Sequence, residues 1–245
     1  MSLEINNLTG GYTQLPVLKN VSFSVKDREI VGLIGLNGAG KSTTIKNVIG
    51  LLAPFEGSIT LDGITLDDSP NDYRKKIGFV PETPVLYEEL TLKEHLEITM
   101  MAYDLSEKSW TRAIELLKIF RLEDRLEWFP SFFSKGMKQK VMIVTAFMVS
   151  PQLFIIDEPF LGLDPIAIND LLKLLVEEKE KGASVLMSTH VLATAEKYCD
   201  SFVILHKGEV YASGTLEELR TQFKQPNASL DDLYIELTKE EGKLL

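Results

Sequence analysis

Apolar and polar residues alternate along the N-terminal part of the chain in a way that predicts short β-strands. This alternation is typical of strands with one buried and one exposed face. The run from Glu29 to Gly35 is instead apolar throughout its middle, which indicates a strand buried on both faces. The elements predicted here are strands at 3–8, 17–25, 29–35, 58–61 and 77–80, and a helix from Gly40 to about Gly50. We expect Gly50 to cap that helix, because glycine readily ends helices in a left-handed conformation.

Helical patterns replace the strand patterns between residues 91 and 149. Thr91 and Glu94 have the spacing of a capping box, which predicts the start of a helix. Apolar residues three positions apart between 114 and 120 indicate one buried face on the next helix. Ser134 is expected to begin a third helix, whose second half is apolar on all sides and therefore buried. We interpret this segment as a helical block inserted into an α/β domain.

Strand and helix patterns alternate again after the helical block. Residues 153–157 and 184–188 are predicted to be buried strands, joined by a helix that begins at Asp164 and ends at Gly182. Such β–α–β alternation favours a parallel sheet with right-handed connections. A last amphipathic helix is predicted behind Ser229. The predicted fold class is therefore α/β, with a mainly parallel sheet, an N-terminal antiparallel β-subdomain and an inserted α-helical subdomain.

Composition adds limits on the class of protein. The 245 residues are 44% hydrophobic and 25% charged, and 36 acidic against 26 basic side chains give a formal charge of −10. This acidic balance argues against a protein that coats nucleic acid, so no nucleic-acid partner is expected. Cys199 is the single cysteine, which excludes an intramolecular disulfide framework. Since no apolar run reaches the roughly 18–20 residues of a spanning helix and no signal peptide is evident, we expect a cytoplasmic location.

A glycine-rich sequence follows the first buried strand. Residues 35–42 match the pattern G-x-x-x-x-G-K-[ST], between a predicted strand and a predicted helix. Gly38 and Gly40 allow the backbone to curl until successive N–H groups point at phosphate oxygens. Lys41 is expected to reach the β- and γ-phosphates, whereas a turn that binds nothing would not need this lysine. The predicted nucleotide-binding residues of this segment are Gly35, Asn37, Gly38, Ala39, Gly40, Lys41, Ser42 and Thr43.

A pair of acidic residues, Asp157 and Glu158, ends the next buried strand. The strand carries them to the carboxyl edge of the sheet, where α/β proteins bind their ligands. Asp157 and the Ser42 hydroxyl are expected to ligate Mg²⁺, and Glu158 is expected to act as general base on the attacking water. Such a pair alone is often a solvated acidic turn. Together with the phosphate loop, it predicts a catalytic site for a nucleotide phosphate and Mg²⁺.

Two further motifs carry a resemblance to a known family. Residues 133–140 read Phe-Ser-Lys-Gly-Met-Lys-Gln-Lys, residues 161–164 read Leu-Gly-Leu-Asp, and His190 follows the next predicted strand. In this order and spacing, nearly the whole chain resembles the ATP-binding cassette of ABC transporters. The sequences at 133–140, 158–165 and 229–234 resemble, more specifically, those of cassettes of ABC-2-type exporters. Among these, the chain is most similar to the Ecs-type ATP-binding subunits of Gram-positive bacteria.

The resemblance implies a P-loop NTPase core and a single ABC ATPase domain over residues 1–245. In this division, residues 1–83 and 151–223 form the α/β core with its β-subdomain. Residues 84–150 form the helical subdomain that carries the signature motif, and residues 224–245 form a short C-terminal helical tail.

The resemblance also implies roles for single residues. Tyr12 matches the aromatic residue that stacks on adenine, although a strand-end tyrosine can also simply pack on the sheet. Ser134 and Gly136 match the signature motif, which closes over the γ-phosphate bound by an opposing cassette. Ser134 would also cap its helix, and the two roles are compatible. His190 matches the switch histidine that contacts the γ-phosphate and is assigned to catalysis with Glu158.

Other positions leave alternatives or depart from the family pattern. Asp164 matches the loop that signals between two ATP sites, and it fits equally well as the N-cap of the following helix. Glu82 stands where the family normally has a glutamine that contacts Mg²⁺. Because a carboxylate is also a magnesium ligand, the predicted metal ligands are Ser42, Glu82 and Asp157. Lys135 replaces the first glycine of the signature motif.

The leading functional hypothesis is the ATP-hydrolysing subunit of an ABC transporter that energises export. Its predicted partners are a separate integral membrane permease, which holds it at the inner face of the cell membrane, and a second cassette, with which it forms a homodimer or pseudo-dimer on binding ATP. The alternative is a soluble ABC-type ATPase in a non-transport process. The single phosphate loop and the short interval between Ser42 and Ser134 disfavour the translation and chromosome types. A GTPase is disfavoured because the chain lacks a guanine-reading N/T-K-x-D element, and a P-loop kinase because kinases lack the Ser134 signature.

Overall fold

The computed structural model describes residues 3–13 and 15–241, which are organised around a six-stranded sheet. Its strands lie in the order β5-β6-β7-β3-β8-β9, and among them β9 alone pairs antiparallel. The bounds are β3 Ile30–Ile34, β5 Ile77–Val80, β6 Leu153–Asp157, β7 Ser184–Ser188, β8 Ser201–His206 and β9 Glu209–Gly214. Because β3, β6 and β7 run parallel, their carboxyl ends meet at one edge of the sheet.

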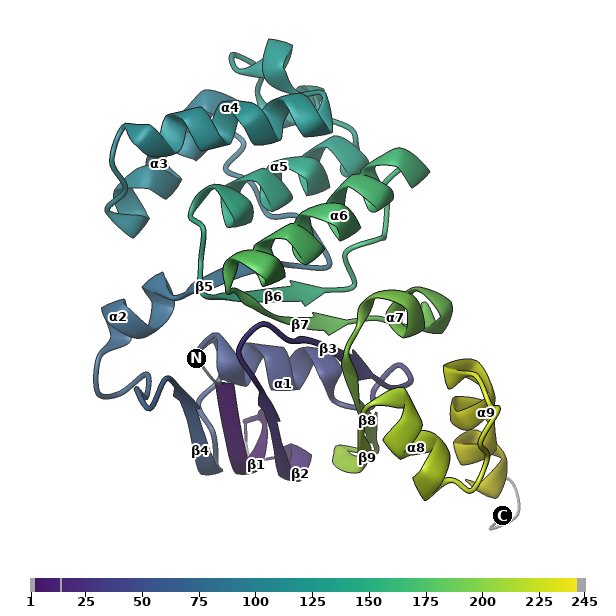
Figure 1. Ribbon diagram of the computed structural model, residues 1–245. Coiled ribbons are helices and arrows are strands. Elements are labelled where there is room, and N and C mark those ends of the chain that lie inside the picture. The colour runs from purple at the N-terminus through teal and green to yellow at the C-terminus, as the bar shows by residue number, and fades with distance from the viewer. Residues whose placement is uncertain (1–2, 14, 242–245) are drawn as a thin grey trace.

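A smaller antiparallel sheet is formed by N-terminal strands in the order β2-β1-β4. The bounds are β1 Leu3–Tyr12, β2 Leu15–Val25 and β4 Glu56–Leu61. Helix α1, Lys41–Val48, lies between the two sheets (Figure 1). Its Ile45 shares a buried cluster with Leu3 of β1 and Ile155 of β6. This packing on both sides fixes the start of α1 directly behind the end of β3.

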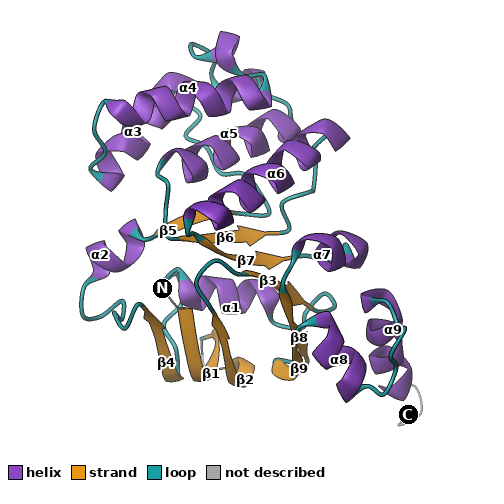
Figure 2. Ribbon diagram, in the orientation of Figure 1, coloured by secondary structure: helices purple, strands orange, loops and turns teal. Residues whose placement is uncertain are grey.

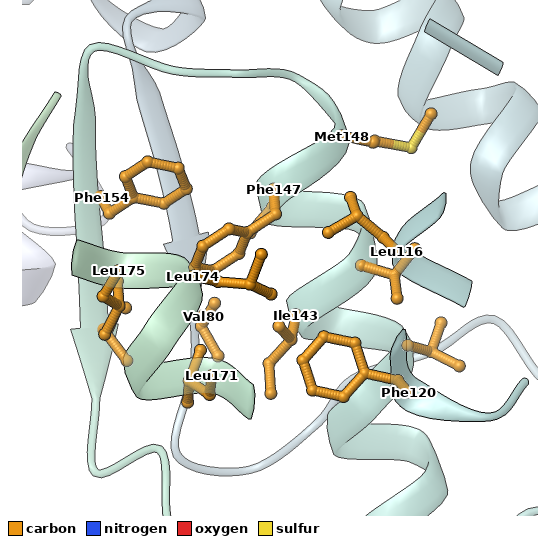
Figure 3. Close-up of a cluster of buried hydrophobic side chains, with 14 of the residues drawn as sticks. Val80, Leu116, Phe120, Ile143, Phe147, Met148, Phe154, Leu171, Leu174 and Leu175 are labelled. Atoms are coloured by element: carbon orange, nitrogen blue, oxygen red, sulfur yellow. The ribbon is translucent and has the colours of Figure 1, made fainter. Parts of the chain in front are cut away.

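The inserted helices and α6 enclose a second core on the other face of the large sheet (Figure 2). The helices are α3 Leu92–Tyr103, α4 Lys108–Phe120, α5 Lys135–Met148 and α6 Pro165–Lys181. Phe120, Ile143 and Leu171 meet here from α4, α5 and α6 (Figure 3). The rings of Phe147 and Phe154 lie 4.4 Å apart and join α5 to β6. The second half of α5 is mostly buried, as its apolar pattern predicts.

The structure also contains elements that the hydrophobic pattern did not predict. They are α2 Pro70–Lys75, α7 Leu192–Tyr198, β8, β9 and α8 Leu216–Gln222. The three helices span two turns or less, so a 3.6-residue period has too few positions to show itself. The last helix, α9 Leu230–Glu241, begins behind Ser229 as predicted. Residues 1–2 at the N-terminus, and 242–245 of the predicted C-terminal tail, lie outside the described residues.

Side-chain caps confirm three predicted helix starts. Thr91 and Glu94 form a complete capping box at the start of α3. The Ser134 side chain accepts a hydrogen bond from the Met137 N–H at the start of α5, and the Asp164 side chain accepts one from the Ala167 N–H at the start of α6. Each cap satisfies a backbone N–H that has no partner within its helix. These boundaries are therefore determined locally.

Glycine takes part in the ends of two helices, once as predicted and once with a shift. Gly182 caps α6 with a φ of 118°. The prediction that Gly50 caps α1 is wrong by one position, because Ile49 is the C-cap. Gly50 follows it with a φ of 75°, so its left-handed conformation turns the chain after the cap.

The predicted α/β fold class is confirmed by the mainly parallel sheet, the antiparallel N-terminal sheet and the helices packed around them. In residues 3–13 and 15–241, no helix has both the length and the apolar character needed to span a bilayer. The carboxyl edge of the large sheet is the place where the predicted chemical residues come together.

Candidate functional site

A tight loop joins the end of β3 to the first turn of α1. Within it, Gly38 and Gly40 have φ values of 83° and 110°, which glycine adopts without a Cβ clash. A Cβ at Gly40 would also lie 2.6 Å from the Leu18 Cδ2 atom, so a larger residue would displace a buried side chain. The N-terminus of α1 has no side-chain cap. Its free N–H groups and partial positive charge make this loop a place for an anion.

The ammonium group of Lys41 lies within this loop. Its Nζ atom donates a hydrogen bond to the Gly35 carbonyl at 2.8 Å and lies 3.6 Å from the Glu158 Oε1 atom. The Lys41 side chain is only 7% exposed. A Cβ at Gly35 would lie 2.7 Å from the Leu205 carbonyl oxygen, so this position has no room for a side chain. The loop therefore holds one buried cation, paired with a carboxylate from a distant part of the chain.

Glu158 lies between Lys41 and His190. It has a φ of 46°, a left-handed conformation that is uncommon outside glycine and often found at functional sites. Its N–H lies within hydrogen-bond distance of the Ser188 carbonyl and hydroxyl oxygens, at 3.2 and 3.1 Å. Its Oε2 atom lies 2.7 Å from the His190 Nδ1 atom and accepts a hydrogen bond from the His190 backbone N–H at 3.2 Å. Backbone and side-chain contacts thus fix the direction of this carboxylate.

Asp157 lies one residue deeper, at the end of β6. The Ser188 hydroxyl donates a hydrogen bond to the Asp157 Oδ1 atom at 2.5 Å, and Asp157 is nearly buried. Ser188 therefore contacts both acidic residues, since it also accepts from the Glu158 N–H. No role for Ser188 was predicted from the sequence. Its position at the end of the neighbouring parallel strand could have indicated one, because α/β proteins bind their ligands at this edge of the sheet.

A cavity of about 350 Å³ opens in front of the phosphate loop. The predicted residues that line it are Asn37, Gly38, Gly40, Lys41, Ser42, Thr43, Glu82, Glu158 and His190. Val17, Leu36 and Leu161 line it as well, and the sequence did not mark them. Leu36 falls on an unspecified position of the phosphate-loop pattern, Leu161 was noted only as part of the sequence at 161–164, and Val17 belongs to an ordinary strand pattern. Apolar residues of this kind carry no chemical signal in a single sequence.

Tyr12 lies beside α1 and is 44% exposed, but it does not line the cavity. Its hydroxyl accepts a hydrogen bond from the Lys46 Nζ atom at 3.0 Å, and the same ammonium lies 5.3 Å from the centre of its ring. The hydrogen bond from Lys46 lowers the pKa of the Tyr12 hydroxyl, and Thr43 adds to this effect. Since Thr43 lines the cavity, the Tyr12 ring lies beside the cavity and not among the residues that line it.

Ser134 and Gly136 lie at the start of α5 and line no part of this cavity. The Ser134 hydroxyl accepts a hydrogen bond from the Met137 N–H at 3.2 Å. A Cβ at Gly136 would lie 2.3 Å from the carbonyl oxygen of Gly162, so glycine is required here by packing alone. The structure thus separates the signature residues from the phosphate loop of their own chain.

Glu82 reaches the cavity from the loop that follows β5. The preceding residue, Pro81, accepts a hydrogen bond through its carbonyl from the Gln139 Nε2 atom at 2.9 Å. Gln139 lies on α5 and is fully buried. The segment that carries Glu82 is therefore attached to the same helix that begins with the signature residues.

The other histidines and the cysteine lie outside the cavity. The His95 Nε2 atom accepts a hydrogen bond from the Tyr87 N–H at 2.9 Å, which gives His95 a structural role in α3. His206 ends β8. A Cβ at Gly32 would lie 3.2 Å from the Cys199 sulfur, so the thiol points at β3. Burial raises the pKa of this thiol to about 12, which keeps it neutral and unreactive at ordinary pH.

A glycine-rich loop, its lysine, and a carboxylate held at the edge of a parallel sheet together define a P-loop nucleotide hydrolase. A family model described as "ABC transporter" matches residues 18–161 of the chain. The chain belongs to this family. It is the ATP-binding subunit of an ABC transporter and an ATPase.

Known relatives support this assignment over the whole chain. The ABC-type transporter ATP-binding protein EcsA of Bacillus subtilis (strain 168) is 65% identical over 241 residues, which are 98% of each chain. A solved ATP-binding subunit of an ABC transporter is 60% identical with a TM-score of 0.95, covering 97% of this chain and 100% of the other. A dimeric cassette in a post-hydrolysis state, bound to ADP and Pi, is 30% identical with a TM-score of 0.79, covering 87% and 98%. The resemblance to Ecs-type cassettes is confirmed.

Proposed function

We propose that this ATPase energises export through a separate integral membrane subunit, to which it binds on the cytoplasmic face of the cell membrane. The similarity of residues 133–140 and 158–165 to cassettes of ABC-2-type exporters supports the direction of transport. EcsA is described as the ATP-binding protein of an ABC-type transporter, and we infer the corresponding role for this chain.

The contacts among Lys41, Glu158 and His190 carry the catalytic proposal. Phosphates in the loop draw the Lys41 ammonium toward them, which frees the Glu158 carboxylate to accept a proton from the attacking water. His190 holds the second carboxylate oxygen and contacts the γ-phosphate. Because phosphoryl transfer depends mainly on positioning and charge stabilisation, a carboxylate whose direction is fixed in advance is well suited to this step.

The oxygen groups near the loop fit a magnesium ion. Mg²⁺ usually takes few protein ligands and completes its shell with substrate phosphates and water. Ser42 and Glu82 line the cavity, and Asp157 is oriented by Ser188 at the same edge of the sheet. We propose these three residues as its direct or water-mediated ligands. A bound magnesium ion would neutralise charge on the β- and γ-phosphates.

Tyr12 is proposed to stack on the adenine ring. Its half-exposed ring is held in place by Lys46 and lies next to Thr43 at the cavity. The remaining loop residues, Gly35, Asn37 and Ala39 among them, would bind phosphates through the backbone or support the loop that does so. This assignment separates affinity, which depends on Tyr12, from chemistry, which depends on Glu158.

We propose that Ser134 and Gly136 complete the ATP site of a second copy in a head-to-tail dimer. Both residues lie at a helix N-terminus, which attracts anions, and neither lines the cavity of its own chain. A related cassette has been solved as a dimer with ADP and Pi. In this proposal the chain is one ABC ATPase domain, with the signature surface on the helical subdomain at 84–150 and the phosphate loop in the core.

Capture of partners from cells tests the transporter proposal. The tagged full-length chain is purified from membranes solubilised in a mild detergent, with the Glu158→Gln variant run in parallel to slow turnover. We expect an integral membrane protein in equal amounts with the cassette. Recovery of ribosomes or DNA without any membrane protein would overturn the proposal in favour of a soluble ABC-type ATPase.

A further inference from the structure

Helix α9 packs directly on α7, the helix that follows His190. Figure 1 shows α9 next to α7 and α8, away from the inserted helices. Helices α7 and α9 meet through four buried side chains of one apolar cluster: Leu192, Ala195, Leu230 and Leu233. Since α7 begins only two residues after His190, its packing on α9 determines where the segment that carries this histidine lies.

A hydrogen bond also joins the start of α9 to α7. The backbone N–H of Leu230, the first residue of α9, donates to the Glu196 Oε2 atom of α7 at 2.7 Å. An N–H in the first turn has no partner within its own helix, and the helix dipole favours a carboxylate at this end. The Asp232 N–H of the same turn donates to the Ser229 hydroxyl at 3.1 Å. Glu196 therefore attaches α9 to α7 at a defined point.

A second cavity, of about 550 Å³, adjoins the nucleotide cavity and is bounded by α9. Residues 34–37, at the end of β3 and in the phosphate loop, line it together with His190, Leu192 and Tyr234. His190 lines both cavities. Its side chain is 60% exposed, so little packing holds the ring beyond its contact with Glu158. The position of the ring therefore depends on the backbone that carries it and on the walls of these cavities.

We infer that α9 positions His190 for hydrolysis, with Glu196 and Tyr234 as the positioning residues. Glu196 fixes α9 on α7, and Tyr234 forms the α9 wall of the second cavity, which His190 also lines. With α9 in place, the segment between β7 and α7 keeps the His190 ring on the Glu158 carboxylate. Without these contacts the ring moves away from Glu158 and hydrolysis slows, while the phosphate loop still binds ATP. The inference rests on the proposed contact between His190 and the γ-phosphate.

Tyr234→Leu in the full-length chain tests the wall of the second cavity, because it keeps an apolar side chain on α9 and removes the ring. We expect kcat for ATP hydrolysis to fall about tenfold, as for a misplaced catalytic group, while the affinity for a fluorescent ATP analogue stays within about twofold. Tyr234→Phe keeps the ring and is expected to keep most of the rate. The matched control is Ile235→Ala, since Ile235 is 47% exposed on the same helix and lines neither cavity. Its rate is expected to stay within about twofold of the parent.

Glu196→Ala tests the attachment of α9 to α7. We expect kcat to fall about tenfold, as for loss of one hydrogen bond to a charged group. Glu196→Gln keeps an oxygen for the Leu230 N–H and is expected to keep most of the rate. Glu217→Ala removes an exposed carboxylate of α8, paired with Arg220 of the same helix, and is expected to leave the rate within about twofold. Thermal unfolding of each variant identifies any rate lost through unfolding.

Nuclear magnetic resonance of the histidine rings reports the position of His190 directly. The chain has three histidines, and His190→Gln assigns the signals of this one. We expect Tyr234→Leu and Glu196→Ala to shift the His190 ring signals, because the ring moves away from Glu158. His95 accepts a hydrogen bond from the Tyr87 N–H at the start of α3, and its signals are expected to stay in place. A general loss of structure would instead move both.

His190 is tested first, so that the two proposals fail separately. If folded His190→Gln hydrolysed ATP at the parent rate, the proposed contact with the γ-phosphate would be wrong, and this inference with it. If His190→Gln is slow, three results would overturn the inference alone. They are a parent kcat in either Tyr234→Leu or Glu196→Ala, equal losses in Tyr234→Leu and Ile235→Ala, and unmoved His190 signals in folded variants that hydrolyse ATP slowly.

Discussion

Two surfaces of this chain are built in opposite ways. At the edge of the parallel sheet, Lys41, Glu158 and His190 contact one another and line one cavity. At the start of α5, Ser134 accepts a hydrogen bond from its own helix, Gly136 packs against the Gly162 carbonyl, and both lie outside that cavity. The first surface has the parts of a catalytic site within one chain. The second has a helix N-terminus, which attracts anions, and it lies outside the cavity at the phosphate loop of its own chain.

This difference is what the proposed head-to-tail dimer requires, in which one ATP site is divided between two copies. A site that is complete in one chain would be free to hydrolyse ATP at all times. A site that lacks its closing surface depends on a second copy, so that hydrolysis is linked to association. Substitutions on each surface test this difference.

Glu158→Gln is expected to have the largest effect, because it removes the proposed base from the surface that carries the phosphate loop. The amide keeps the size of the side chain, so ATP binding is retained while hydrolysis falls by about 10²- to 10⁴-fold. Phosphate release measures the rate, and light scattering measures the ATP-bound dimer that we expect to accumulate. Glu88→Gln removes a carboxylate outside the cavity and serves as control. Hydrolysis at the parent rate would show that Glu158 is not the base.

Ser134→Ala changes the surface at the start of α5. We expect hydrolysis to fall by about 10²-fold through loss of a γ-phosphate contact, with ATP affinity of the monomer unchanged. The variant also loses an N-cap, which lowers the free energy of unfolding by about 1 kcal/mol. Thr91→Ala removes the N-cap of α3 and is the matched control. If both variants lost hydrolysis equally, Ser134 would act only by capping its helix.

Tyr12→Ala is expected to act on binding alone. Stacking on a base contributes about 1–3 kcal/mol, so we expect ATP affinity to fall about tenfold, measured by calorimetry, with kcat at saturation nearly unchanged. Tyr12→Phe keeps the ring and removes the hydrogen bond from Lys46, so its affinity stays near that of the parent. An unchanged affinity of Tyr12→Ala would remove this residue from the site.

The smallest effect is expected in the response of stability to acid. The pKa of Asp164 is lowered from 3.8 in the folded protein, mainly by the hydrogen bond from Lys140. Its stabilising contribution is therefore present above the unfolded pKa and is lost as the pH falls below about 4 through the folded pKa. Chemical unfolding at several pH values measures it, since Asp164→Asn removes this part of the acid dependence. An identical acid dependence in the variant would contradict the assignment.

Much of the fold could be predicted because its signals are local. The side chains of Thr91, Ser134 and Asp164 each accept a hydrogen bond from a backbone N–H three residues later, so their residue types predict where a helix begins. A continuous apolar run predicts a buried strand such as β6. The short helices α2, α7 and α8 could not be predicted from periodicity, and neither could the order of the strands, because pairing depends on residues far apart in sequence.

The candidate site was predicted in part for the same reason. The phosphate loop and the acidic pair are contiguous motifs, so their residue types are visible in the chain. Val17, Leu36 and Leu161 could not be recognised as cavity residues, since nothing in their chemistry sets them apart from other apolar positions. Ser188 was overlooked because its role depends on the strand beside it.

The amino-acid sequence shows which groups are available: a loop able to hold phosphate, two carboxylates after a buried strand, and a capped helix with small residues at its start. Which of these groups meet depends on the tertiary structure. It placed Glu158 between Lys41 and His190, left Ser134 and Gly136 outside that cavity, and paired Lys140 with Asp164. The reason is physical: a local motif follows from the conformations of neighbouring residues, whereas these contacts exist only after β3, β6, β7 and the helices have packed together.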